Sequence, residues 1–358
     1  MRFLSFLVLF VTSLTLQAQE FDYLKHLQFG DGEGDDDESR KIAFFQNGDL
    51  LVAGQFEGLI DFDPKLTEAN LQISLEQSGE PYLVRYSPKG DLIWIKPIRS
   101  DRSADIYGLL VDSLDQIFIT GSYIQEIIFD EANPNARLSG VSPNDADGYI
   151  SKFDGNGNFI WAQRFAGTGI DAGIDLEFNS LGELVVFGVF GDSLLFDAAD
   201  SSSLRVSAGA GDVFCGGYDA SNGQFIWVKS FSGLGFDNPR DLEIDSIGNY
   251  YLMGDYTSTI SFSLNPLISL SSSGGNDIFI AKLSPSRQLL WAEKLAGSST
   301  DLGANLLIAH NNRILISGTF RSNIQLDPAG IQPSFSGTNF NTDVFLLALD
   351  SAANFQWA

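Results

Sequence analysis

The chain has 358 residues, which is long enough for one large repeat domain or for several smaller domains. It carries 46 acidic and 21 basic side chains, so its formal net charge is -25 at pH 7. This charge argues against nucleic acid as a partner, because a phosphate backbone would be repelled, and it disfavours anionic membrane surfaces.

Residues 1–18 predict a secretory signal peptide. Arg2 supplies a positive charge, Phe3 to Leu16 form an apolar run, and Ala18 is a small residue suited to precede the cleavage site. The run is too short to cross a membrane comfortably as a helix. No later segment looks able to span a membrane, so we expect a secreted or surface-bound protein.

A short stretch around tryptophan is repeated along the rest of the chain. The intervals between Trp94, Trp161, Trp227, Trp291 and Trp357 are 67, 66, 64 and 66 residues. A fixed period of this length is typical of repeat architectures. Residues 21–29 add a partial copy, in which Tyr23 and Leu27 take the places of Trp161 and Phe165. We therefore predict an extra strand at 21–29.

Each repeat contains four predicted strands, here called A to D in chain order. After Trp161 they read GIDLEFN, LVVFGVF, DVFCGGYD and QFIWVKSF, with turn-forming residues between them. Between strands B and C each repeat has more than twenty residues with two short alternating pieces. These predict an extra β-hairpin, or an extension of strands B and C.

Two further features recur at fixed offsets from the tryptophans. Strand B contains a glycine two residues before an aromatic residue, and strand C opens with an acid. The glycines are Gly54, Gly121, Gly188, Gly254 and Gly318, and the acids are Glu80, Asp147, Asp212, Asp277 and Asp343. A glycine inside a strand indicates close backbone approach or a bulge. We interpret the tryptophans, glycines and acids as residues that build the repeat.

Four antiparallel strands per repeat, with no helical pattern, predict an all-β fold, a β-propeller. It would have about five blades of about 66 residues each. The predicted blades are residues 31–100, 101–167, 168–233, 234–297 and 298–358, within a domain of residues 19–358. The sequence ends one residue after Trp357, inside a predicted strand D, which favours further blades or a C-terminal domain beyond it. Five blades in a complete chain is the alternative.

The repeat resembles the SBBP-type β-propeller repeats of secreted bacterial proteins. The resemblance rests on DSIGNYYLMGDY and NDIFIAKLSPSRQLLWAEKLAG in the fourth copy and DGYISKFDGNGNFIWAQRFAG in the second. It covers about residues 20–358 and implies a secreted or cell-surface protein of a bacterium. His310-Asn311-Asn312, where the family pattern has D-x-x-G-N, departs from it.

Repeated aspartates predict one acidic face of the propeller. They fall in the D–A connections and in the B–C excursions: Asp105, Asp171, Asp237 and Asp301, then Asp63, Asp130, Asp197 and Asp327, with Ser263 breaking the second series. Such a face could bind calcium or a basic ligand, but a position repeated in all units is better explained by turn capping. Asp31, Glu33, Asp35 and Asp37, in the acidic run DGEGDDDE, are the weak metal candidates. The turn DGNGN at Asp154 resembles part of a calcium loop, but a hairpin turn explains it better.

Residues for catalysis are scarce. The only histidines are His26 and His310, and the single cysteine, Cys215, lies in a strand pattern that predicts burial. A Ser-His-Asp triad or a zinc site has little to build on. We therefore predict a non-catalytic binding or adhesion module with an unknown protein or glycan partner and no cofactor. The alternatives are a glycan-active propeller enzyme with carboxylates in its channel and an envelope-assembly scaffold.

Overall fold

The structure is a computed structural model that describes residues 38–63, 71–73, 79–197, 200–264, 266–332, 334–337 and 341–358. Within these residues the regular structure is β-strand, apart from one 3-10 turn at Ser201–Ser203. The predicted all-β class is confirmed. None of the helical structure in the described part is long and apolar enough to cross a membrane. The predicted signal peptide and the predicted strand at 21–29 lie outside the described residues.

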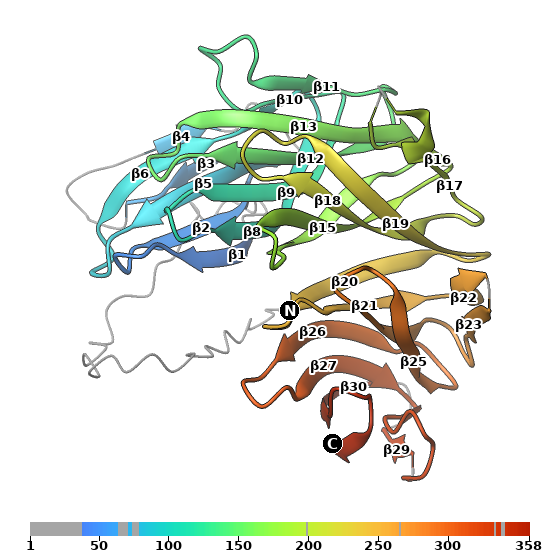
Figure 1. Ribbon diagram of the computed structural model, residues 1–358. Coiled ribbons are helices and arrows are strands. Elements are labelled where there is room, and N and C mark those ends of the chain that lie inside the picture. The colour runs from blue at the N-terminus through green and yellow to red at the C-terminus, as the bar shows by residue number, and fades with distance from the viewer. Residues whose placement is uncertain are drawn as a thin grey trace.

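Five antiparallel sheets with the same A-B-C-D order follow one another along the described chain (Figure 1). The strand A positions are β1 (Glu38–Phe44), β8 (Ser103–Val111), β14 (Ala172–Phe178), β20 (Asp237–Ile244) and β26 (Leu302–Ile308). The strand B positions are β2 (Leu50–Phe56), β9 (Ile117–Ile124), β15 (Glu183–Phe190), β21 (Tyr250–Tyr256) and β27 (Ile314–Arg321).

The outer half of each sheet is formed by strands C and D. The strand C positions are β5 (Glu80–Tyr86), β12 (Ala146–Phe153), β18 (Asp212–Asp219), β24 (Asp277–Leu283) and β30 (Thr342–Leu349). The strand D positions are β6 (Leu92–Pro97), β13 (Phe159–Thr168), β19 (Phe225–Gly233), β25 (Leu289–Gly297) and β31 (Phe355–Trp357). Strands A contact one another in the order β1, β8, β14, β20 and β26, so they form the inner edge of the stack.

The excursion between strands B and C is a hairpin, and in the second to fifth repeats it pairs with the chain of the preceding repeat. The hairpins are β3 (Leu59–Asp61) with β4 (Leu71–Ile73), β10 (Glu126–Ile128) with β11 (Arg137–Ser139), β16 (Ser193–Leu195) with β17 (Leu204–Val206), β22 (Thr259–Leu264) with β23 (Leu267–Ser271), and β28 (Asn323–Gln325) with β29 (Phe335–Ser336). β16, β22 and β28 pair with the end of strand D of the preceding repeat, and β10 pairs with β7 (Arg99–Ser100), which follows β6. Each of these hairpins therefore ties two neighbouring repeats together by backbone hydrogen bonds.

The repeated strand B glycines lie opposite a bulge in strand A. In all five sheets the register shifts directly after the residue that pairs with the glycine. A Cβ added to Gly121 would lie 1.8 Å from the carbonyl oxygen of Asp105, and one added to Gly54 would lie 1.9 Å from that of Glu38. A side chain at these positions would therefore displace strand A.

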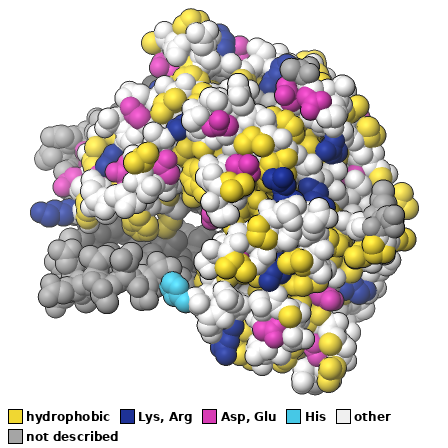
Figure 2. Space-filling model, in the orientation of Figure 1, with side chains coloured by type: hydrophobic (Ala, Val, Ile, Leu, Met, Phe, Trp, Pro, Cys, Tyr) yellow, Lys and Arg dark blue, Asp and Glu magenta, His cyan; other side chains and the backbone are white. Residues whose placement is uncertain are grey.

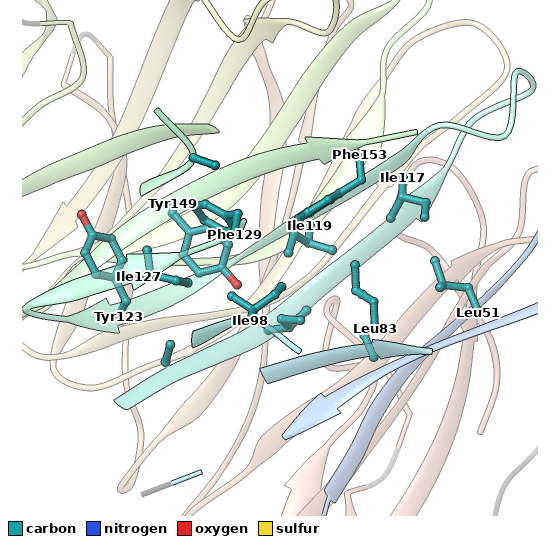
Figure 3. Packing of buried hydrophobic residues seen from close by; sticks show 14 of the residues in the cluster. Leu51, Leu83, Ile98, Ile117, Ile119, Tyr123, Ile127, Phe129, Tyr149 and Phe153 are labelled. Atoms are coloured by element: carbon teal, nitrogen blue, oxygen red, sulfur yellow. The ribbon is translucent and has the colours of Figure 1, made fainter. Parts of the chain in front are cut away.

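The apolar core lies between successive sheets. Leu51 of β2 and Leu83 of β5 belong to one buried cluster with Ile117 and Ile119 of β9, and Figure 3 shows this packing. Other clusters join the second sheet to the third, the third to the fourth and the fourth to the fifth. Burying one such side chain contributes about 1.5–3 kcal/mol, so the fold depends on sheet-to-sheet contact.

We predict that Gly121→Ala lowers the free energy of unfolding by about 2–4 kcal/mol, because the added Cβ collides with the backbone of β8. Urea unfolding followed by tryptophan fluorescence measures the loss. Gly216→Ala is the matched control, since the nearest atom to its added Cβ would be Tyr218 Cε2 at 3.5 Å, an ordinary van der Waals contact. Equal effects of the two substitutions would contradict this account of the strand B glycine.

Candidate functional site: the A–B turn face

The turns between strands A and B are built in the same way in three consecutive repeats. The side-chain oxygens of Asp112, Asn179 and Asp245 each accept hydrogen bonds from the backbone N–H groups two and four residues later. Such side-chain capping fixes a turn without help from tertiary contacts. The residue two positions after the capping side chain is held at the tip of each turn.

These tips carry exposed aliphatic side chains. Leu114 is 76% exposed, Leu181 is 75% exposed and Ile247 is 71% exposed. The first and fifth repeats have Asn47 and Asn311 in the corresponding place. The three aliphatic residues thus share one position in three consecutive turns.

Neighbouring turns lie against one another. The backbone N–H of Gln46 donates to Asp115 Oδ1 at 2.8 Å, which joins the first A–B turn to the second. A Cβ added to Gly248 would lie 2.9 Å from Ser180 Oγ, so the third and fourth turns are also adjacent. Because β8, β14 and β20 also lie side by side, the turns that follow them lie at one end of the inner strands, and this end is here called the A–B turn face.

A second group of polar residues lies on the inner strands. Asp175 Oδ2 accepts the backbone N–H of Leu242 at 3.0 Å, and Asp241 Oδ2 accepts that of Leu306 at 2.6 Å. Each aspartate thus joins its own strand A to the strand A of the next repeat. Lys41 Nζ lies 4.0 Å from Asp175 Oδ1 and adds a positive charge.

Two glutamates on these strands have perturbed acidity. Burial, with the nearby Asp175, raises the pKa of Glu177 to about 7. Burial, with Glu177 and Asp175, raises the pKa of Glu243 to about 8. Groups that titrate near neutral pH are able to act as general acids, so these two residues on the inner strands are candidates for an enzymatic role.

The repeated tryptophans reach toward the next repeat. Trp94 Nε1 donates to the carbonyl oxygen of Gly155, and Trp291 Nε1 to that of Ser351, both at 3.2 Å and both in the next C–D turn. Trp227 Nε1 donates to Glu183 at 2.9 Å within its own sheet, whereas Trp161 is buried and Trp357 is 42% exposed. These contacts place the first and fourth tryptophans at sheet junctions.

A basic residue near the end of strand C contacts the same turns. Lys152 Nζ donates to the carbonyl oxygen of Ala220 at 2.9 Å, and Lys282 Nζ to that of Ser351 at 3.0 Å. In the first repeat Arg85 Nη1 donates to Gly155. These side chains therefore join one repeat to the next.

The predicted acidic face is wrong for several of its residues. Asp171, Asp237 and Asp301 are fully buried, and Asp63 and Asp327 are nearly so. Asp171, Asp237 and Asp301 are buried because their backbone N–H groups bond to the preceding sheet, where successive sheets meet. On the face in Figure 2, Asp and Glu side chains are scattered among hydrophobic ones.

The assignment of Asp105 to the D–A series also needs correction. Ile106 pairs with Gly121 as Gly173 pairs with Gly188, so the residue that corresponds to Asp171 is Ala104. Asp105 instead accepts a hydrogen bond from Arg40 at 2.8 Å. Counting along the sequence missed this because the two positions differ by one residue.

The metal candidates Asp31, Glu33, Asp35 and Asp37 lie outside the described residues. In the described part no three or more His, Cys, Asp or Glu side chains form a group that could hold a metal. Asp154 Oδ1 accepts the N–H groups of Asn156 and Asn158, so DGNGN is built as a capped hairpin turn.

The cysteine and the histidines were the other residue types considered for catalysis. Cys215 is buried, and burial raises the pKa of its thiol. His310 is exposed in an A–B turn, and His26 is not described. The aliphatic turn tips were missed, although their common position two residues after Asp112, Asn179 and Asp245 is visible in the sequence.

The repeated four-stranded sheets, stacked with strand A innermost, define a β-propeller-type repeat protein. No protein-family model matches the chain, so the resemblance to SBBP repeats stays a prediction. The number and limits of the blades stay predictions as well.

The chain shows limited similarity to known proteins in sequence and in structure. The chain is 21% identical to an uncharacterized WD repeat-containing protein of Acanthamoeba polyphaga mimivirus, over 84% of this chain but only 26% of that protein. Among solved structures, a Bacteroides caccae protein of unknown function has a TM-score of 0.41 and 10% identity, covering 91% of this chain and 81% of that one. A mannose phosphorylase of Leishmania mexicana has a TM-score of 0.39 and 11% identity, covering 80% of each chain.

We predict that Glu243→Gln stabilises the protein in alkali. A carboxyl whose folded pKa is about 8, against about 4.3 when unfolded, contributes stability below the unfolded value and loses it as the pH rises through 8. Glutamine stays neutral, so the variant should gain about 1–3 kcal/mol at pH 8 and little at pH 4. Urea unfolding at the two pH values measures this. The exposed Glu131→Gln is the control, and a gain that is the same at both pH values would contradict the pKa of Glu243.

Proposed function

We propose that the protein is an exported, non-catalytic β-propeller repeat protein that binds a partner protein through its A–B turn face. The observation that carries this proposal is the set of three exposed aliphatic tips, Leu114, Leu181 and Ile247, at one position of three consecutive capped turns. Exposed aliphatic groups gain free energy only when another surface covers them. Capped turns present them with little loss of entropy on binding.

The chemistry of this face favours a protein over a glycan partner. Its exposed tips are aliphatic, and they match the apolar centre of a protein interface. The net charge of -25 favours a partner with basic groups around that centre, because opposite charges speed association.

We predict that replacing Leu114, Leu181 and Ile247 together by serine weakens partner binding by about 100-fold, from the loss of three apolar contacts. Wild-type and variant proteins would be immobilised and exposed to culture medium of the producing cells. Bound proteins would then be identified, and their affinities for both forms measured by titration.

The control replaces Leu234 and Ile331 by serine, since these residues are 76% and 80% exposed but lie outside the A–B turns. All these substitutions are at the surface, so they should change the free energy of unfolding by less than about 0.5 kcal/mol each. Equal binding by the triple variant and the wild type would reject the A–B turn face as the binding site.

A glycan-active enzyme is the second candidate function. Glu177 and Glu243 support it, because their raised pKa values suit a general acid on the inner strands. Hydrolysis of aryl glycosides by the wild type, lost in Glu177→Gln or Glu243→Gln, would favour the enzyme over the binding module.

We predict that the exported protein begins at Gln19. The charged start, apolar run and Ala18 direct cleavage after residue 18. N-terminal sequencing of protein collected outside the cells measures this. A mature chain that still begins at Met1 would contradict both the signal peptide and the export route.

A further inference from the structure

Pairs of buried carboxyl groups occupy three consecutive junctions between sheets. The first member opens strand C, and the second precedes or opens strand A of the next sheet. The pairs are Asp147 with Asp171, Asp212 with Asp237, and Asp277 with Asp301, all fully buried. In each pair the backbone N–H of the second aspartate donates to the carbonyl of the residue before the first, at 2.7–2.9 Å.

The middle pair shows an asymmetric set of hydrogen-bond donors. Asp212 Oδ2 accepts the N–H of Ala208 at 2.7 Å, and Asp212 Oδ1 accepts the N–H of Gly233 at 2.9 Å. Neither carboxyl oxygen of Asp237 has a donor among the described residues, and its carboxyl group faces that of Asp212. The donors therefore suit an ionised Asp212, whereas Asp237 lacks any group that would stabilise a negative charge.

The three pairs differ in the charged groups around them: a cation acts on the first aspartate of the first and third pairs, whereas among the described residues Asp212 is the only charged group acting on Asp237 of the middle pair. The hydroxyl of Tyr256, on β21, is a further titratable group near Asp237. Arg164 of β13, Asp145 and Tyr123 lie near the first pair, and Lys294 of β25 and Tyr256 lie near the third. Two ionised carboxylates buried side by side would repel each other strongly.

At the junction between the first and second sheets, the buried negative charge is compensated by an ion pair. There Ala104 replaces the second aspartate, and the remaining acid, the fully buried Glu80, forms an ion pair with Arg99. A single carboxylate with a guanidinium is neutral. Where the second carboxyl is present, no comparable ion pair is formed by either aspartate of the middle pair within the described residues.

We propose that the middle pair holds one proton, so that the neutral carboxyl group donates its O–H to the partner carboxylate and joins the third and fourth sheets in a pH-dependent way. In the middle pair Asp237 is the donor and Asp212 the acceptor. This hydrogen bond forms in acidic and neutral solution and is lost in alkali. It is independent of the A–B turn face and of the proposed partner.

The acidity of Asp237 agrees with this assignment. Burial, with the neighbouring acid, raises the pKa of Asp171 and of Asp237 to about 8 and that of Asp301 to about 7. The unfolded value is about 3.9, so the folded state binds protons that the unfolded state has released. The stability contributed by the middle pair is complete below pH 4 and is lost as the pH rises through 8.

The test is Asp237→Asn in the full chain. The amide N–H of asparagine replaces the carboxylic O–H as the donor to Asp212 and cannot be titrated. We expect the wild-type urea midpoint to fall between pH 5 and pH 8.5, and the variant to lose a measurable part of that fall and to be more stable than the wild type at pH 8.5. The infrared carbonyl band of a buried protonated carboxyl should also weaken in the variant at pH 6.

Asp212→Asn is the matched control. It replaces one of the two oxygens that accept backbone N–H groups with an NH2 group, so it should lower the midpoint at both pH values. A wild-type midpoint raised by calcium and lowered by a chelator would overturn the proposal, because the pair would then hold a cation instead of a proton. Equal pH dependence of Asp237→Asn and the wild type, with an unchanged infrared band, would overturn it as well.

Discussion

The structure depends on the junction between one sheet and the next. No single sheet buries both of its faces, because its apolar side chains are covered only when the neighbouring sheet lies against them. In repeat architectures of this kind the stability is a sum of nearest-neighbour contacts. The hairpins that cross to the preceding strand D add backbone hydrogen bonds to the same junctions.

Much of a single repeat could be predicted from the sequence, because its signals are local. Alternating side chains and turn formers give strands A to D, and the glycine at Gly121 marks the bulge opposite it. The direction of the B–C hairpin could not be predicted. The pieces LLFDA and LRVSA read as a hairpin, but nothing in their pattern says that β16 pairs with β13 of the preceding repeat.

The candidate site was less accessible to sequence reasoning. Burial of Asp171 depends on the approach of a second sheet, and a list of repeated aspartates contains no information on that approach. In the sequence Leu181 looks like an ordinary turn residue. Its exposure depends on two structural features: Asn179 caps the turn, and no described segment covers its tip. Burial of the acids and exposure of the aliphatic residues are both set by tertiary packing, which the local sequence pattern does not contain.

One type of glycine connects the hairpin to the carboxyl pair. A Cβ on Gly233 would lie 1.9 Å from the carbonyl oxygen of Thr259, so only glycine lets the hairpin approach strand D this closely. The N–H of the same Gly233 points to Asp212. Gly167 is placed in the same way. A Cβ added to it would lie 1.8 Å from the carbonyl oxygen of Ser193, and its N–H donates to Asp171. The same glycine therefore takes part both in the pairing of the hairpin with strand D and in the burial of the carboxyl group. A change of charge on that carboxyl group acts directly on the end of strand D, to which the hairpin of the next repeat is bonded.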